Sequence, residues 1–203
     1  MSGATRDEVG TEHGSAARGL FACVVLGLVL RGLEAALTSV WLDELHTLWV
    51  AAAPGVGALN ARLAEDTHTP LFYVVVQLLD GALGAHALRW LSIAIGILAV
   101  VPLDGIARAA GFGRAARIAT AGLFCALPYQ IQWGAELRPY AWLQLATVVL
   151  AWAAFTPAAS AGGRRGRFAA FALATAFGLY SHLFTAFAVL GIGAARLVFR
   201  RRE

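Results

Sequence analysis

Long apolar runs constrain this chain more than any other feature of its sequence. Several are close to 20 residues long, which is the length that one helix needs to cross the hydrocarbon core of a bilayer. Hydrophobic residues make up 59% of the chain and charged residues only 14%, about half the charge of an ordinary soluble domain. The apolar residues fill whole segments rather than one helix face, which predicts an all-α, polytopic transmembrane helical bundle.

Residues 19–203 are predicted to form one transmembrane module that follows a polar tail. Residues 1–18 interleave acids and bases and are rich in Gly, Ala and Ser, so we expect a disordered cytoplasmic tail there. The expected spanning helices cover about 19–40, 87–107, 117–133, 140–156, 168–181 and 183–199. Cys23 and Cys125 both lie inside apolar runs, which predicts buried thiols rather than a disulfide.

Three groups of arginines between the runs set the expected topology. They are Arg108, Arg114 and Arg117; Arg164, Arg165 and Arg167; and Arg200, Arg201 and Arg202. The positive-inside rule assigns all three groups to the cytoplasm. If both termini are also cytoplasmic, one of the three runs before the first group does not cross. The run over 70–85 is short and contains Gln77 and Asp80, so we expect it and the stretch 43–53 to be interfacial helices in the first outer loop.

Two adjacent carboxylates, Asp43 and Glu44, directly follow the first expected span. Acidic residues in this position commonly cap the helix that comes next. Trp41 is a typical interfacial anchor, and it would hold the pair at the membrane surface. A carboxylate held there can take a proton from a hydroxyl group or bind a divalent cation, and the sequence leaves both alternatives open.

Three more outer connections carry ionisable side chains. His68 precedes the run that starts at Pro70, Glu136 and Arg138 share a short turn, and His182 lies in another. Each has an ordinary structural explanation as part of a helix cap, a local ion pair or an interfacial histidine. Because all of them are expected on the same side as Asp43, together they predict a polar site at the outer membrane surface. His68 and Arg138 are candidates to bind phosphate there.

Arg31 and Glu34 lie near the outer end of the first expected span. A charge inside an apolar helix needs a partner or must extend to the interface. Their spacing of three residues places them on one helix face, so we expect them to pair with each other or to extend outward.

Taken in order, four motifs resemble those of bacterial glycosyltransferases of the GT-C superfamily. The motifs are Trp-Leu-Asp-Glu from Trp41, His-x-Pro-Leu-x-Tyr from His68, Glu-x-Arg-Pro-Tyr-Ala from Glu136 and Tyr-Ser-His from Tyr180. The resemblance is to the protein-mannosyltransferase-like and aminoarabinose-transferase-like groups, and it covers about residues 20–202.

This resemblance implies an enzyme of the cell membrane that transfers a hexose or pentose on the extracytoplasmic face. The donor would be a polyprenyl-phosphate sugar, and the acceptor a glycan, lipid or protein; the resemblance implies no nucleic acid. Asp43 would be the catalytic carboxylate, supported by Glu44. The residues expected to contact the substrates are His68, Glu136, Arg138, Tyr140 and His182. A divalent cation is an open alternative.

The chain departs from the family in two ways. Thr69 stands where the family has the first proline of a His-Pro-Pro motif. Family members also have more spanning helices, so the chain is expected to correspond to their N-terminal catalytic half. Two alternatives follow: a truncated, non-catalytic membrane protein, or one part of a split glycosyltransferase whose second chain supplies further helices. A transporter is disfavoured, because the ionisable groups cluster at the helix ends.

Overall fold

The computed structural model describes residues 6–64, 68–80 and 82–200, and all the regular secondary structure of these residues is α-helical. The expected all-α class is therefore confirmed. In chain order the helices are α1 (Arg6–Leu37), α2 (Leu42–Ala51), α3 (Val56–Ala64), α4 (Pro70–Asp80), α5 (Ala85–Ile97), α6 (Val100–Ala109), α7 (Arg114–Ala126), α8 (Pro128–Ala135), α9 (Tyr140–Phe155), α10 (Ala161–Ser181) and α11 (Thr185–Arg200).

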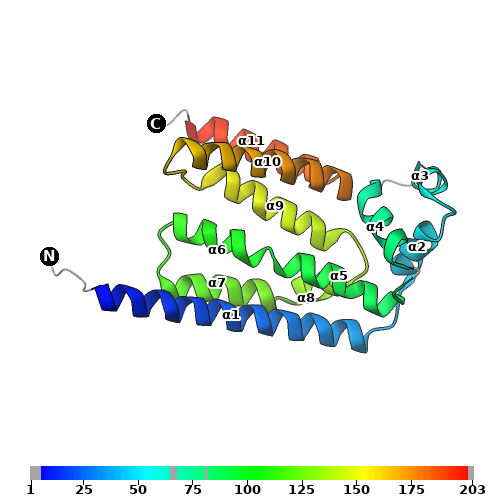
Figure 1. Ribbon diagram of the computed structural model, residues 1–203, viewed down its shortest axis with the longest axis horizontal. Coiled ribbons are helices and arrows are strands. Elements are labelled where there is room, and N and C mark those ends of the chain that lie inside the picture. Colours follow the sequence, from blue (N-terminus) through cyan, green and yellow to red (C-terminus); the bar gives the residue numbers. More distant parts are fainter. Residues whose placement is uncertain (1–5, 65–67, 81, 201–203) are drawn as a thin grey trace.

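The longer helices run back and forth along one elongated bundle (Figure 1). Helix α1 packs against α5, α7 and α8, and α9 packs against α5 and α6 on one side and α10 and α11 on the other. Helices α2, α3 and α4 lie together across one end of the bundle. The start of α1, the end of α11 and the α6–α7 and α9–α10 connections lie at the other end (Figure 1). The first arginine group lies where α6 ends and α7 begins, and the second lies at the start of α10, so both are far from α2–α4.

Two of the expected spans are each built from two helices, because prolines interrupt them. Pro128 is the first residue of α8, where its missing N–H group and fixed φ angle are tolerated. Pro102 lies in the first turn of α6, and its ring is incompatible with a regular carbonyl four residues earlier, at Leu98. Leu98 is the C-cap residue directly after the last residue of α5, Ile97. The expected spans over 87–107 and 117–133 therefore each contain a break between two helices.

The expected disordered tail over 1–18 was also wrong for its described part. Helix α1 begins at Arg6 and ends at Leu37. The polar residues before Gly19 continue the helix that the apolar run forms, because extending a helix costs much less than nucleating one. Residues 1–5 of the expected tail lie outside the described residues.

The first connection of the chain folds into a small helical layer. Helices α2 and α4 occupy the two stretches expected as interfacial helices, and α3 was not anticipated. The apolar core of this layer extends into the main bundle through Leu137 and Trp142. Buried members from the layer itself include Val50, Leu59, Leu63, Phe72, Tyr73 and Val76. This shared core fixes α2 and α4 against the ends of α5 and α9.

Arg31 lies inside the bundle and does not reach the surface. Its side chain is fully buried, and its guanidinium donates to the carbonyl oxygens of Gly27 (3.2 Å), Cys125 (3.1 Å) and Phe124 (3.4 Å). The expected pairing with Glu34 was wrong, since Arg31 instead binds carbonyls at the C-terminal end of α7, which the helix leaves without partners. Cys125, and Cys23 beside the same interface, are buried free thiols as expected.

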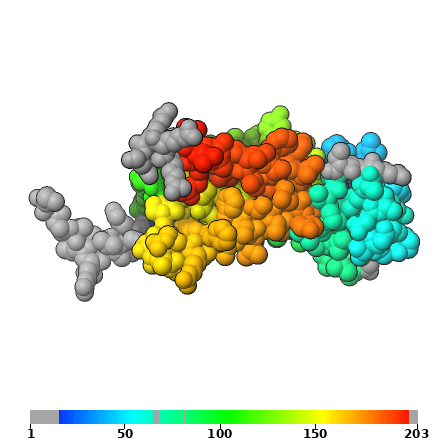
Figure 2. All heavy atoms as spheres, turned by 90° about the horizontal axis from the view of Figure 1, so that it is seen from above, coloured from blue at the N-terminus to red at the C-terminus, as the bar shows by residue number. Residues whose placement is uncertain are grey.

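Large apolar side chains cover the outside of the bundle. Examples are Phe21, Val29 and Leu33 on α1, Phe168 and Leu173 on α10, and Phe187, Leu190 and Leu197 on α11, all more than half exposed. Helices α10 and α11 form one continuous face along the bundle (Figure 2). By length and composition, Ala16–Leu37 and Ala85–Ala109 are long and apolar enough to cross a membrane.

Candidate functional site

Glu44 ties the start of α2 to the rest of the bundle. It is the third residue of α2, and its Oε2 accepts a hydrogen bond from the backbone N–H of Trp41 (3.3 Å), as a carboxylate at this helix position commonly does. Its Oε1 accepts another from the backbone N–H of Leu137 (2.8 Å). Because the side chain is fully buried, these bonds join α2 rigidly to the turn between α8 and α9.

Arg89 binds the carboxylate of Glu44 and the backbone carbonyls that follow the end of α1. Its Nε and Nη2 donate to the two carboxylate oxygens of Glu44 at 2.8 Å and 2.5 Å. Its Nη1 donates to the carbonyl oxygens of Ala35 and Thr38, and its Nη2 to that of Ser39. The carbonyls at the C-terminal end of a helix have no partner within the helix. Arg89, only 2% exposed, therefore fixes the corner that leads from α1 to α2.

These contacts keep the carboxyl group of Glu44 ionised. Burial by itself raises the pKa of this carboxyl, but the hydrogen bonds from Arg89 and Leu137 outweigh burial and hold the pKa below its ordinary value. An ionised carboxylate with four donors around it is not available to take a proton from a substrate. We therefore assign Glu44 a positioning role: it orients the neighbouring Asp43.

Arg138 forms hydrogen bonds with polar groups from three segments of the chain. Its Nη1 donates to the backbone carbonyl of Asp43 (3.2 Å), Oγ1 of Thr47 (3.4 Å) and the hydroxyl of Tyr73 (3.4 Å). Its Nη2 lies 3.0 Å from Nε2 of His68. Because a guanidinium can only donate, this histidine nitrogen is the acceptor. The turn after α8 is thus connected to α2, to α4 and to the segment before α4.

The charge of Arg138 is buried, and it acts on the nearby carboxyl of Glu136 without forming an ion pair with it. The residue is only 5% exposed, and no carboxylate of the described part of the chain forms an ion pair with it. Its Nε also has no hydrogen-bond partner among the described residues. The ring of Tyr140 lies 5.8 Å from the guanidinium. Since buried charges are normally paired, this arrangement suits a bound anion.

His182 borders the same cation from α10. Its ring lies 6.0 Å from that of His68 and 5.8 Å from that of Tyr140, measured between centroids. Burial first, and then the neighbouring His68 and Arg138, lower its pKa to about 4. Its Nδ1 accepts a hydrogen bond from the backbone N–H of Phe184 (3.2 Å). His182 is therefore neutral at pH 7, and its Nε2 carries the hydrogen and can donate to an anion.

Glu136 contributes a buried carboxyl group to the site. It is 8% exposed, and burial, followed by the charge of Glu44, raises its pKa to about 7. It lines a pocket of about 260 Å³ together with Arg89, Trp41 and Gln132. Glu34, Thr38 and Ser39 line the same pocket. A carboxyl that titrates near neutral pH beside a pocket is suited to acid–base chemistry or to binding hydroxyl groups.

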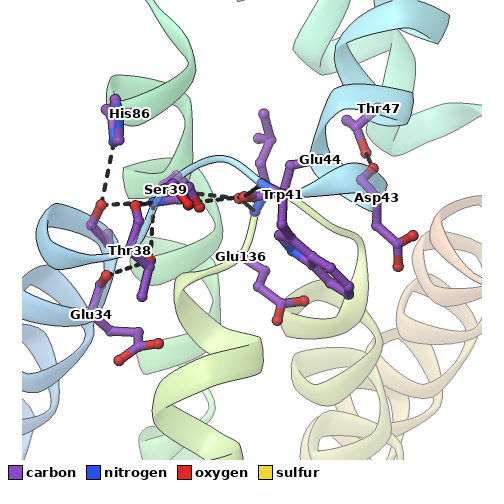
Figure 3. A network of polar contacts seen from close by, with 12 residues as sticks. Glu34, Thr38, Ser39, Trp41, Asp43, Glu44, Thr47, His86 and Glu136 are labelled. Carbon is purple, nitrogen blue, oxygen red and sulfur yellow. Dashed lines mark hydrogen bonds and ion pairs between the residues drawn. The ribbon is translucent and has the colours of Figure 1, made fainter.

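Asp43 presents the accessible carboxylate of the site. It is half-buried at the start of α2, and its backbone carbonyl accepts hydrogen bonds from Thr47 Oγ1 (3.1 Å) and Arg138. Figure 3 shows its carboxylate pointing away from the network around Glu44, to the same side as that of Glu136. Within the described residues, no group of three His, Cys, Asp or Glu side chains could hold a metal ion. A divalent cation at Asp43 stays a prediction.

The structure brings all the expected site residues to one end of the bundle. Helix α2 supplies the two acids, the α8–α9 turn and the start of α9 supply Glu136, Arg138 and Tyr140, and the ends of two other segments supply His68 and His182. Arg89 and Thr47 were not anticipated. For Arg89 a signal existed, because it is a charged residue within an apolar run. Thr47 is an ordinary helical threonine and offers no such signal.

No protein-family model, curated protein or solved structure matches this chain.

Proposed function

We propose that this chain is an integral-membrane glycosyltransferase. It moves a sugar from a polyprenyl-phosphate donor to an acceptor on the extracytoplasmic face. The proposal depends on one observation. Arg138 is a buried cation that forms no ion pair with a described carboxylate, and it binds the backbone of Asp43, whose own carboxylate is accessible. A lipid-linked phosphate needs such a cation, and an incoming hydroxyl group needs such a base.

Two observations support the membrane location. The outer faces of α1, α10 and α11 expose large apolar side chains, which soluble proteins rarely do over a large area. The first two arginine groups lie at the end opposite to the polar site, as the positive-inside rule requires if the site is extracytoplasmic. In the proposed topology six segments cross, both termini are cytoplasmic and the layer α2–α4 lies at the outer surface.

A neighbouring pocket supports a donor with a lipid chain. It has a volume of about 510 Å³ and is mostly apolar, with Phe124, Trp133, Leu143 and Val148 among its lining residues. Tyr140 also lines this pocket, and the same ring lies beside Arg138 and His182. A lipid whose phosphate binds at Arg138 could therefore extend its chain along α9.

The proposed reaction is a direct displacement at the anomeric carbon. A bond forms between the acceptor oxygen and the anomeric carbon, and the bond from that carbon to the phosphate oxygen breaks. The acceptor proton passes to the carboxylate of Asp43, and polyprenyl phosphate leaves with the electron pair. Arg138, with the Nε2–H group of His182, stabilises the negative charge on the leaving phosphate. Glu136 and the polar groups of its pocket bind sugar hydroxyls.

Transfer of labelled sugar tests the proposal. The full chain is placed in lipid nanodiscs with polyprenyl-phosphate hexoses and pentoses that carry a radiolabel, together with membrane extract as the acceptor source. We expect wild-type protein to move label out of the donor lipid. Asp43→Asn should reduce the rate at least a hundredfold, because general base catalysis commonly contributes roughly 10²–10⁴-fold.

Asp80→Asn is the matched control, since this carboxylate at the end of α4 is no part of the cluster. It should transfer at the wild-type rate. Equal rates for wild type and Asp43→Asn would refute the role of Asp43. The absence of transfer by folded wild-type protein with every donor would favour the non-catalytic alternative, and transfer that appears only with a second chain would favour the split enzyme.

A further inference from the structure

A second pocket lies at the end of the bundle away from the candidate site. It has a volume of about 570 Å³ and is formed where α9 ends, α10 begins and α11 ends. Its lining combines the aromatic side chains of Phe155, Phe168 and Phe171 with three arginines, Arg164, Arg167 and Arg196. None of these residues contributes to the polar site around Asp43.

The arginines are held at the pocket by the end of α9. Arg167 stacks on the indole of Trp152 at 3.5 Å and donates to its backbone carbonyl (3.3 Å). Arg196 donates to the backbone carbonyl of Ala154 (2.5 Å). Both acceptor carbonyls belong to the last turn of α9, so two guanidinium groups have defined positions.

The pocket carries positive charge that no carboxylate of the described residues neutralises. No carboxylate of the described residues forms an ion pair with Arg164, Arg167 or Arg196. The side chain of Arg164 is exposed and donates no hydrogen bond to a described group. Three cations beside an apolar wall match an amphiphile with an anionic head group, because neither a soluble anion nor a neutral lipid would use both parts.

We propose that this pocket binds the phosphate of an anionic phospholipid in the cytoplasmic leaflet. The arginines contact the phosphate, and the phenylalanines contact the first part of the acyl chains. This inference rests on the membrane location proposed above, but it uses none of the residues proposed for transfer. The bound lipid would join α9, α10 and α11 at the end of the bundle far from α2–α4, where Figure 2 shows α10 and α11 side by side.

Native mass spectrometry of the full chain tests this site. The protein is released from detergent in the presence of equal amounts of phosphatidylglycerol and phosphatidylcholine. We expect wild-type protein to retain phosphatidylglycerol preferentially. The double variant Arg164→Gln/Arg196→Gln should lose this preference by roughly tenfold to thirtyfold, because each arginine near a lipid surface contributes about a fivefold effect. Arg167 is left intact because it packs on Trp152.

The control removes the same charge elsewhere at that end of the bundle. Arg18→Gln/Arg108→Gln changes two arginines that do not line the pocket, and it should keep the wild-type preference. Equal loss in both double variants would overturn the proposal, as it would show a general charge effect. Displacement of the lipid by millimolar glycerophosphate would also overturn it, since a soluble anion would then suffice. Sugar transfer should be unchanged in both variants, so failure here is distinguishable from failure of the proposed function.

Discussion

Asp43 and Glu44 are neighbours in the sequence, but their side chains have different surroundings. Successive residues of a helix point about 100° apart, so Glu44 turns into the bundle while Asp43 faces the open side. Glu44 is fully buried and bonded to Arg89. The Glu44–Arg89 ion pair anchors the start of α2 to the bundle, and α2 thereby fixes the orientation of Asp43.

The Glu44–Arg89 pair should be strongly coupled. Glu44→Gln or Arg89→Gln leaves one charge buried without its partner, and each should lower the free energy of unfolding by about 3–5 kcal/mol. The double variant should cost clearly less than the sum of the two. Thermal unfolding in detergent measures these differences. As a control, Arg108→Gln removes an exposed partner of Asp104 and should cost below about 1 kcal/mol; additive effects of the Glu44 and Arg89 changes would contradict the coupling.

Glu136 should make stability depend on pH. Its pKa rises from an ordinary value of 4.5 to about 7 in the folded chain, so the folded state keeps a proton that the unfolded state has already lost. The free energy of unfolding should therefore fall as the pH rises from 4.5 through 7. Glu136→Gln should not show this decrease. The free energy of unfolding of the variant minus that of wild type should therefore increase between pH 4 and pH 8, by up to roughly 3 kcal/mol.

Unfolding midpoints measured from pH 4 to pH 8 check this prediction. Asp80→Asn serves as the control carboxylate and should follow the wild-type curve. Parallel curves for wild type and Glu136→Gln over the whole range would contradict the raised pKa.

At the scale of the elements, the sequence predicted where helices lie better than where they break. Hydropathy located the stretches that became α1, α9, α10 and α11, because each is a continuous apolar run. The breaks at Leu98 and Leu127 depend on single prolines, which a hydropathy pattern passes over. Helix α3 was missed because its nine residues show only two core positions, Leu59 and Leu63.

The packing of α8 on α1 should depend on the absence of a side chain at Gly134. A Cβ atom at Gly134 would lie 2.5 Å from Nε of the buried Arg31, so Gly134→Ala should lower the free energy of unfolding by about 1–3 kcal/mol. Gly166→Ala in α10 has open space around the new methyl group. It should be neutral or slightly stabilising, because alanine favours a helix. Thermal unfolding of both variants tests this, and equal stability would contradict the close packing.

At the scale of the whole molecule, the sequence predicted the members of the site but not what holds them. Asp43, His68, Arg138 and His182 could be found because each stands in a short polar connection between apolar runs. Arg89 could not be assigned a role, since its partner is 45 residues away in sequence and the contact exists only in the folded bundle. The same holds for Arg31, whose acceptors belong to α7.

The proposed topology predicts opposite accessibility of the two ends. The native thiols of Cys23 and Cys125 are buried and should give little background labelling. Gly84→Cys changes the connection between α4 and α5, which lies at the end of the polar site, and Ala159→Cys changes the connection between α9 and α10, which lies at the other end (Figure 1). A membrane-impermeant maleimide should label the first in intact cells and the second only after permeabilisation. Labelling of both from one side would contradict the topology.

Binding of polyprenyl phosphate tests the central claim most directly, which is that the buried charge of Arg138 receives a lipid phosphate. The wild-type chain in detergent is titrated with polyprenyl phosphate, and with polyprenol as the uncharged reference. We predict that wild type binds the phosphate at least tenfold more tightly than polyprenol, and that Arg138→Gln abolishes this difference while Arg138→Lys keeps part of it. Arg62→Gln, at the same end of the bundle, should behave as wild type. Equal affinity of wild type and folded Arg138→Gln for polyprenyl phosphate would contradict the account.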